Sequence, residues 1–465
     1  MNGGLPEGDA STTGALRHMT AGAAIQWRPM ADDQHAHASL RLLLVRVAAA
    51  LNSSGLTVDD VQRRVERIGL AYGADDVRIS ALPTFVMLSM SGGEPANLEV
   101  TPMSADAPQL DRVAAIERLC AEAERGEVTV DDALDELDAI EARPPRYGVA
   151  LRVIGDAVLS TGLCLVLRPA RREVIAAAAL GLVVGVLRPL VGSRRPLRIL
   201  LPVLAAFVVA TLSGVATRNG VVGTGIRPIV ASLIVFLPGA TLTSAVLELG
   251  SGQVVAGASR LVSGILTLAL LAFGILAGTE VAGVSAHQAL AGSTQLLDAW
   301  APWLGVAIFA AGVALTSAAP KHATPGLLAV LYAAWAAQLG ANQLWGSYVG
   351  ALVGAIVLVL AASLIARLPH MLPRQASFLP GFWLLVPGAL GLIGFTSWVA
   401  PEGTVPSADL QVTAGSIFAV AVGVLIGSQV WEWLVTGEKV VARHTDGPAR
   451  LGRFITRSKH SGDSP

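Results

Sequence analysis

The chain has 465 residues, of which 53% are hydrophobic and 14% charged, and its mean hydropathy is +0.60. Soluble proteins carry roughly 25% charged residues, so this composition excludes an ordinary soluble protein and indicates a membrane protein. The formal net charge of −1 conceals an acidic segment, because residues 39–146 hold 11 Arg and no Lys against 10 Asp and 9 Glu; this argues against nucleic acid as a partner.

Residues 1–38 are rich in Ala, Gly, Thr, Asp and His and lack the apolar stretch of a signal peptide. They are therefore predicted to be a disordered tail, and the domain behind them is expected to stay in the cytoplasm. Cys120 and Cys164 stand alone without CxxC spacing, so we expect no disulfide framework, no metal site and no cofactor.

Residues 39–146 predict a compact, acidic, cytoplasmic α+β domain. A helical pattern from Ser39 stops at residues 52–55, and Thr57 can cap a second helix. Strands are expected at 77–82, 84–90 and 98–101, followed by helices at 111–125 and 129–141. The domain contains no His, which excludes a Ser-His-Asp or Cys-His site within it.

After residue 146 the chain consists largely of apolar runs long enough to cross a bilayer. They are predicted near 149–167, 174–191, 197–216, 227–247, 255–277, 300–319, 325–345, 348–366, 379–399 and 411–434. A polar connection near 278–298 divides them five and five. The expected fold is a membrane all-α protein with about ten transmembrane helices in two five-helix halves, preceded by the small soluble α+β domain. The corresponding segments are 147–283 for the first half, 284–298 for an extracytoplasmic linker, 299–436 for the second half and 437–465 for a basic cytoplasmic tail.

The positive residues that flank these runs indicate the orientation. Eleven Arg and Lys lie on the flanks that would be cytoplasmic if the first run enters from the inside, and five lie on the opposite flanks. Cytoplasmic flanks carry the excess of positive charge, so both chain ends are predicted to be cytoplasmic.

The fourth apolar run is interrupted by Pro238 and Gly239. Proline removes a helix hydrogen bond and glycine relaxes the backbone, which predicts a kinked or broken helix whose restart would present free N–H groups. Thr241, Ser244 and Glu248 then follow at i, i+3 and i+7, on one helical face. This face suits an ammonium and a hydroxyl group, and the restarted helix end after Gly239 suits a carboxylate, so together they could hold an amino-acid zwitterion. A carboxylate in such a site can also carry a coupling proton.

Pro387 and Gly388 interrupt the ninth run in a weaker echo of this pattern. Interrupted apolar segments at matching places in two halves indicate a transport site between them. Pro387 and Gly388 would form the wall opposite Pro238 and Gly239.

Other polar residues within the apolar runs have two readings each. Arg152 and Asp156 lie one turn apart and either neutralise each other or serve substrate or protons. Glu248 and Arg260 either extend into the headgroup zone or take part in the site. Finally, Trp335, Gln338 and Asn342 form one stripe, which is either an interhelical hydrogen bond beside a packed aromatic or a substrate contact.

Glycines at four-residue spacing predict close helix packing, at Gly181 and Gly185 and again at Gly346, Gly350 and Gly354. These are expected to be contacts within one subunit, with a homo-oligomer seam as the alternative. The sequence has no GxxxxGK[ST] motif, so nothing in it indicates ATP as the energy source.

Four stretches together resemble the bacterial threonine/serine exporter family in its actinobacterial form. They are residues 53–61 (SSGLTVDDV), 81–84 (ALPT), 237–249 (LPGATLTSAVLEL) and 257–260 (GASR), and the likeness extends over about 39–435. The resemblance implies proton-driven export of threonine and serine across the inner membrane, with a cytoplasmic N-terminal domain. A related split form is associated with dicarboxylate export, and no catalytic residue is carried over from the family.

We therefore predict a secondary exporter and not an enzyme, with threonine or serine, protons and the lipid bilayer as its partners. The expected pathway residues are Pro238, Gly239, Thr241, Ser244, Glu248, Arg260, Asp156, Gln338, Asn342, Pro387 and Gly388. The alternatives are a dicarboxylate exporter, a membrane-tethered enzyme, and a passive channel or ligand-sensing module.

Overall fold

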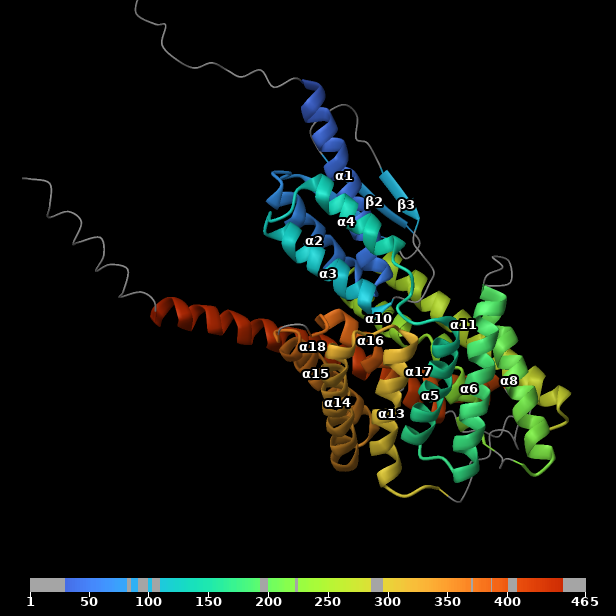
Figure 1. The fold of residues 1–465 in the computed structure, drawn as a ribbon. Helices are drawn as coiled ribbons and strands as arrows, with labels where there is room; N and C mark the ends of the chain where they lie inside the picture. The colour runs from blue at the N-terminus through green and yellow to red at the C-terminus, as the bar shows by residue number, and fades with distance from the viewer. Residues whose placement is uncertain are drawn as a thin grey trace, which may run out of the picture.

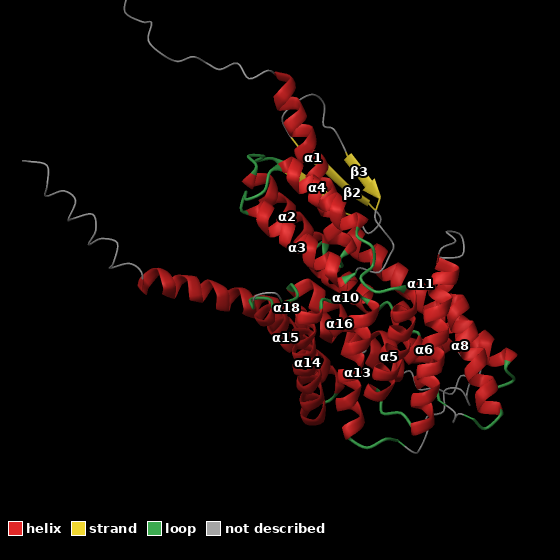
Figure 2. Cartoon of the chain, in the orientation of Figure 1, coloured by secondary structure: helices red, strands yellow, loops and turns green. Residues whose placement is uncertain are grey.

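The computed structural model describes residues 30–81, 85–90, 99–102, 109–192, 200–221, 225–285, 296–368, 371–385, 387–399 and 408–445. An N-terminal unit of four helices and three strands lies at one end of a larger helical body (Figure 1). Figure 2 shows the strands, which lie in the N-terminal unit, while the remaining described elements are helical.

The N-terminal unit contains helices and strands close to the predicted positions. Its elements are α1 (Met30–Ser53), α2 (Val58–Ala71), β1 (Val77–Ala81), β2 (Phe85–Met90), β3 (Glu99–Pro102), α3 (Leu110–Glu124) and α4 (Val130–Ala142). Residues 30–38, expected in the disordered tail, are the first turns of α1, and residues 1–29 lie outside the described part of the chain.

Two threonines fix the starts of α2 and α4. The hydroxyls of Thr57 and Thr129 accept hydrogen bonds from the backbone N–H of Asp60 and Asp132, as N-capping residues do. Both caps belong to the tetrapeptide Thr-Val-Asp-Asp, which occurs at 57–60 and 129–132. The first residue of each helix, Val58 or Val130, thus has a backbone N–H that the helix itself does not use.

A separate hydrophobic cluster holds the N-terminal unit together. The three strands form an antiparallel sheet in the order β1-β2-β3, with Ile79 opposite Leu88 and Val86 opposite Thr101. Val86 and Leu88 alternate with more exposed neighbours, as expected for a sheet with one buried face. They pack with apolar side chains from all four helices, among them Leu43, Val65, Leu119 and Leu137.

The helical body contains the remaining described elements. They are α5 (Val149–Val166), α6 (Arg171–Gly192), α8 (Leu201–Arg218), α9 (Arg227–Ser232), the 3-10 turn η1 (Ile234–Phe236), α10 (Gly239–Gly250), α11 (Val254–Val281), α13 (Trp300–Thr316), η2 (Lys321–Ala323), α14 (Thr324–Trp345), α15 (Ser347–Ile365), α16 (Arg374–Leu384), α17 (Pro387–Val399) and α18 (Ala408–Thr445). The beginning of the expected tail at 437–465 is therefore a continuation of α18, and residues 446–465 are not described.

Six of the described helices are long and apolar enough to cross a membrane: α5, α6, α8, α11, α15 and α18. The other four predicted spans also coincide with helices but differ from simple spans. α13 is shorter, α14 is less apolar, and the fourth and ninth runs are each divided into two helices. The ten-span count thus stays a prediction, whereas the mostly helical membrane fold is confirmed.

The first helices of the two predicted halves, α5 and α13, meet backbone to backbone. A Cβ on Gly162 would lie 2.3 Å from the Phe309 backbone nitrogen, and one on Gly312 would lie 2.4 Å from the Leu159 Cα. Residues near the start of α5 contact the end of α13, because Gly155 lies beside Thr316. The two helices are therefore antiparallel and packed too closely for any side chain at the glycine positions.

A second glycine pattern occurs once in each predicted half. Gly274 and Gly278 of α11 pack against the backbone of α8 around Val203 and Phe207, and Gly423 and Gly427 of α18 pack against α15 around Leu352 and Ile356. In both pairs the contact advances along the two helices in the same direction, so each pair is parallel.

The glycines singled out from the sequence also make contacts within the chain. Gly181 and Gly185 of α6 lie against Ser160 and Val153 of α5, and Gly350 and Gly354 of α15 lie against Gln338 of α14. Gly346 serves another purpose, since it has a φ of +90° and forms the turn between α14 and α15. The intrasubunit reading therefore accounts for these residues.

Candidate transport site at the broken helices

The fourth apolar run is broken where the sequence predicted. After α9 and η1, Leu237 is extended, with φ −68° and ψ 126°, and α10 begins at Gly239 immediately after Pro238. The Leu242 N–H donates to the Pro238 carbonyl over 2.8 Å as the first bond of the new helix. The N–H groups of residues 239–241 precede this bond and have no partner within α10.

The hydroxyl residues of α10 differ in how they are used. The hydroxyl of Thr243 donates to the Gly239 carbonyl over 3.0 Å, so this hydroxyl forms its hydrogen bond within α10. Ser244 is 7% exposed and Thr241 is partly exposed. Among the described residues, no hydrogen bond to protein occupies the hydroxyl of either Thr241 or Ser244.

Glu248, near the end of α10, is fully buried and ion-paired with Arg260 of α11. The Arg260 Nε lies 3.0 Å from the Glu248 Oε2. Gly257 permits this approach, because a Cβ there would lie 2.8 Å from the Leu249 backbone nitrogen of α10. Glu248 and Arg260 thus form a packed pair between two helices.

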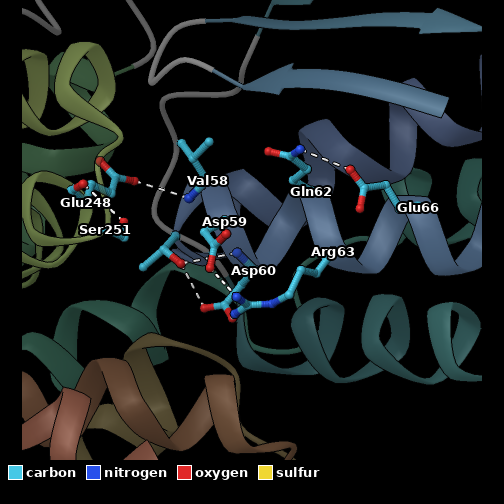
Figure 3. A network of polar contacts seen from close by, with 9 residues as sticks. Val58, Asp59, Asp60, Gln62, Arg63, Glu66, Glu248 and Ser251 are labelled. Atoms are coloured by element: carbon cyan, nitrogen blue, oxygen red, sulfur yellow. Dashed lines mark hydrogen bonds and ion pairs between the residues drawn. The ribbon is translucent and has the colours of Figure 1, made fainter. Parts of the chain in front are cut away.

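Glu248 and Arg260 also form hydrogen bonds with the N-terminal unit. The Val58 backbone N–H at the start of α2 donates to the Glu248 Oε1 over 3.3 Å, and the Arg260 Nη2 donates to the Asn52 Oδ1 over 2.8 Å. Figure 3 shows Glu248 opposite Val58, with Asp59, Asp60 and Arg63 following along α2. The positive end of the α2 dipole therefore faces a buried carboxylate.

The ninth apolar run is also broken, into α16 and α17, and α17 begins at Pro387. Pro387 and Gly388 thus start a helix, as Gly239 does in the first break. The amide of Gln338 on α14 donates to the Leu385 carbonyl just before the break over 3.2 Å. Gln338 therefore makes the expected interhelical hydrogen bond. Asn342, one turn further along α14, is exposed and lies beside Gly350.

The aromatic member of that stripe is packed, as expected. Trp335 is 6% exposed and meets Trp303 of α13 edge to face, with ring centroids 4.5 Å apart. Trp335 therefore supports the α13–α14 contact.

The two broken helices contact each other. α10 packs against α16 and α17, and α9 packs against α17. The arrangement is also reciprocal, because α10 contacts α18 while α17 contacts α11. The structure thus brings the helices that flank the two breaks into one region of the helical body.

Asp156 pairs with a different arginine from the one expected. Its two carboxylate oxygens each accept a hydrogen bond of 2.9 Å from the Nη1 of Arg188 on α6, and Asp156 is 4% exposed. Arg152, one turn away on α5, has a buried Nε without a hydrogen-bond partner. The i, i+4 pairing was wrong because the antiparallel neighbour α6 brings a guanidinium directly to the carboxylate.

A further buried carboxylate, Glu173, was not singled out from the sequence. It is fully buried at the start of α6, where its Oε2 accepts from the Ala170 N–H over 2.8 Å and lies 3.8 Å from the Arg227 Nη1 at the start of α9. Its back-bond to the first turn is half of a capping box, and this spacing was the available signal. Each end of the interrupted fourth run therefore has a carboxylate–arginine pair.

Three of the stretches that carried the resemblance meet at the Glu248 junction. Residues 53–61 supply Val58, residues 237–249 supply Glu248 and residues 257–260 supply Arg260. A segment of the N-terminal unit and two adjacent helices of the body are thus combined in one polar contact.

Comparison with known proteins also joins the N-terminal unit and these helices in one family. The family model described as "Putative threonine/serine exporter" matches residues 42–282, more than half of the chain, from α1 to the end of α11. The chain belongs to the threonine/serine exporter family. It is also 26% identical over 453 residues to a protein of Mycobacterium tuberculosis (strain ATCC 25618 / H37Rv) named "Probable threonine/serine exporter", covering 92% of this chain and 83% of the relative. No solved structure matches.

Membership of the threonine/serine exporter family fits the apolar helices. With six helices long and apolar enough to span a bilayer, this member is a multi-pass membrane protein of an amino-acid exporter family. The family match covers the N-terminal unit from residue 42 onward as well as α5 to α11, so both parts of the Glu248 junction lie within it.

Proposed function

We propose that this protein is a secondary exporter that carries threonine and serine out of the cytoplasm across the inner membrane, driven by the proton-motive force. The observation that carries the proposal is the first helix break. Its restarted helix α10 bears two hydroxyls that have no hydrogen-bond partner among the described residues, and it carries the buried Glu248–Arg260 pair near its end. The second break, which α10 contacts, would supply the opposite wall. The N-terminal unit and both chain ends would lie in the cytoplasm.

The charged pair suits the two charged groups of an amino acid. A guanidinium binds a carboxylate through paired hydrogen bonds, and a buried carboxylate binds an ammonium group. Arg260 and Glu248 would meet these groups, while Thr241 and Ser244 would meet the hydroxyl that distinguishes threonine and serine from aliphatic amino acids.

The helix rise divides these contacts into two positions. Thr241 and Glu248 are seven residues apart, which is about 10 Å along an α-helix, whereas Ser244 and Glu248 are about 6 Å apart. One threonine molecule spans the shorter distance but not the longer one. The substrate would therefore bind first at Glu248 and Arg260 and then move along α10 toward Thr241 and the break.

A gradient of protons can drive such a cycle if a carboxylate on the path exchanges a proton. Glu248 meets this requirement, because a carboxylate beside a competing substrate can take up and release a proton in turn. The repeated glycine contacts α8–α11 and α15–α18, together with the antiparallel α5 and α13, support two inverted halves that rock around the breaks.

The first experiment measures efflux of preloaded labelled threonine, serine and succinate from cells that express the chain, with and without a protonophore. We expect faster loss of threonine and serine than from empty-vector cells, abolished by the protonophore. If only succinate leaves, the substrate is a dicarboxylate. If none leaves while the protein is in the membrane, the exporter proposal fails.

Glu248→Gln tests the assigned role with little change of shape. Proton-dependent efflux should be lost while the protein remains in the membrane, because the amide cannot ionise. The matched control is Glu280→Gln, which alters an exposed carboxylate on the adjacent helix α11 and should leave efflux unchanged. Undiminished proton-dependent efflux in Glu248→Gln contradicts the assignment.

A further inference from the structure

The N-terminal unit contacts the helical body on both predicted halves. On one side, Asn52 and Val58 reach Arg260 of α11 and Glu248 of α10. On the other side, the Leu110 N–H at the start of α3 donates over 2.8 Å to the carbonyl of Ser317, just after α13. Leu110 and Val113 of α3 are buried in the hydrophobic cluster of the helical body. The unit therefore bridges the two halves at the end of α10 where Glu248 lies.

The contacts at Glu248 and Arg260 have the chemistry of an amino acid. The Asn52 side chain offers Arg260 an oxygen acceptor, as a substrate carboxylate would, and the Val58 backbone offers Glu248 an N–H donor, as a substrate ammonium would. One oxygen of Glu248 and one nitrogen of Arg260 are thus already occupied by neutral groups of the N-terminal unit, while the Glu248 Oε2 and the Arg260 Nε face each other.

We propose that the N-terminal unit is a gate at the entrance of the transport path, which amino-acid substrates open by competing with Val58 and Asn52 for Glu248 and Arg260. This rests on the proposed function, because it assigns regulation to the same site. A full ammonium and a full carboxylate bind these two residues more strongly than a backbone amide and a side-chain amide do. The zwitterion displaces α2 from Glu248, while the α3 contact at Ser317 keeps the unit attached to the body.

Proline at position 58 removes the backbone N–H that donates to Glu248. Val58 is the first residue of α2, a position where proline is well tolerated, and Thr57 has the extended conformation that precedes proline, with ψ 154°. Val58→Pro therefore deletes the N–H that reaches Glu248 and retains the helix. Val130→Pro is the control matched in backbone position, since Val130 begins α4 in the second Thr-Val-Asp-Asp, where Thr129 has ψ 160°; Val58 is buried and Val130 is partly buried.

Transport by the purified full chain in lipid vesicles gives the first test. Val58→Pro should lower the threonine concentration that gives half-maximal transport by about fivefold, the factor expected from one hydrogen bond, while the maximal rate is retained. Val130→Pro should leave both values unchanged. Loss of transport in Val58→Pro while Val130→Pro transports normally, or an unchanged half-maximal concentration, overturns the gate.

Hydrogen exchange of the full chain in lipid gives a test that a merely structural contact would not pass. Added threonine should raise amide exchange in residues 52–61 by about threefold or more, as release of a docked segment does, and leave residues 129–137 unchanged. Threoninamide and N-acetylthreonine, which each lack one of the two charges, should have no effect. Slower or unchanged exchange with threonine overturns the gate.

If wild-type vesicles transport no threonine or serine, the proposed function fails and the gate fails with it. If they transport threonine or serine but amide exchange is unaltered, only the gate fails.

Discussion

The side-chain amide of Gln338 donates to the backbone carbonyl of Leu385, at the point where the ninth apolar run is broken. A broken helix leaves carbonyl groups without their usual partners, and in a membrane no water is at hand to replace them. Gln338, which comes from the neighbouring helix α14, thus satisfies one of the groups that the break exposes.

Removal of this amide should weaken the second break. Gln338→Ala is expected to reduce the free energy of unfolding by about 1–2 kcal/mol, because a buried carbonyl loses its donor. Thermal unfolding of the detergent-solubilised protein measures the change. Asn342→Ala, on the same helix but exposed, should change stability by less than about 0.5 kcal/mol; equal losses in the two variants would show that Gln338 acts only through its bulk.

The Asp156–Arg188 pair is expected to be structural. Asp156→Ala leaves the Arg188 guanidinium without its buried partner and should destabilise the protein by about 3 kcal/mol, whereas Asp156→Ala combined with Arg188→Ala should cost less than the two single changes added together. A double-mutant cycle in denaturant measures this coupling. Simple additivity would mean that the two side chains do not interact.

Two glycine-to-alanine changes, one at the α5–α13 contact and one on the open face of α14, should have opposite effects. Gly312→Ala places a methyl group 2.4 Å from the Leu159 Cα and should destabilise the protein by about 2 kcal/mol or more, since backbone must move. Gly340→Ala has nothing within 4 Å of the new methyl and should stabilise α14 by roughly 0.5–1 kcal/mol. Unfolding temperatures of the two purified variants provide the comparison, and a tolerated Gly312→Ala would contradict the close contact.

Cys120 should be unreactive in the folded protein. Burial on α3 raises the pKa of its thiol to about 12, so almost no thiolate is present at pH 8. Alkylation with iodoacetamide followed by mass spectrometry should modify Cys120 only after denaturation, whereas a cysteine placed at the exposed Arg118 of the same helix should react at once. Rapid labelling of native Cys120 would contradict its burial.

The same pKa gives a sign for the pH dependence of stability. The unfolded thiol ionises near pH 8.5, while the folded thiol keeps its proton to about pH 12. Between these values the unfolded state releases a proton that the folded state retains, so stability falls as pH rises. The decline should be smaller in Cys120→Ala, as measured by denaturant unfolding at pH 7.5 and pH 10.

Features determined by neighbouring residues could be predicted from the sequence. Proline lacks an N–H wherever it stands, so Pro238 and Pro387 indicated the two breaks without knowledge of the fold. Likewise, the capping residue Thr57 and the expected strand at 84–90 correctly predicted α2 and β2.

Features determined by distant residues could not be predicted in this way. Val58 and Glu248 are 190 positions apart, and only the packing of the N-terminal unit on α10 brings them together. For Asp156, sequence proximity favoured Arg152, but the antiparallel α6 presents Arg188 at shorter range. The contact glycines are seven residues apart on α5 and again on α13, a spacing that differs from the four-residue pattern typical of close helix packing.

The glycine contact between α5 and α13 also limits how the protein can move. Side chains normally act as a deformable layer between helices, but here the Gly162 and Phe309 backbones touch directly. If one helix slid along the other by a fraction of a turn, the two backbones would clash. The α5–α13 pair is therefore expected to keep its register, and displacement during a transport cycle would be carried by the other helices of the body.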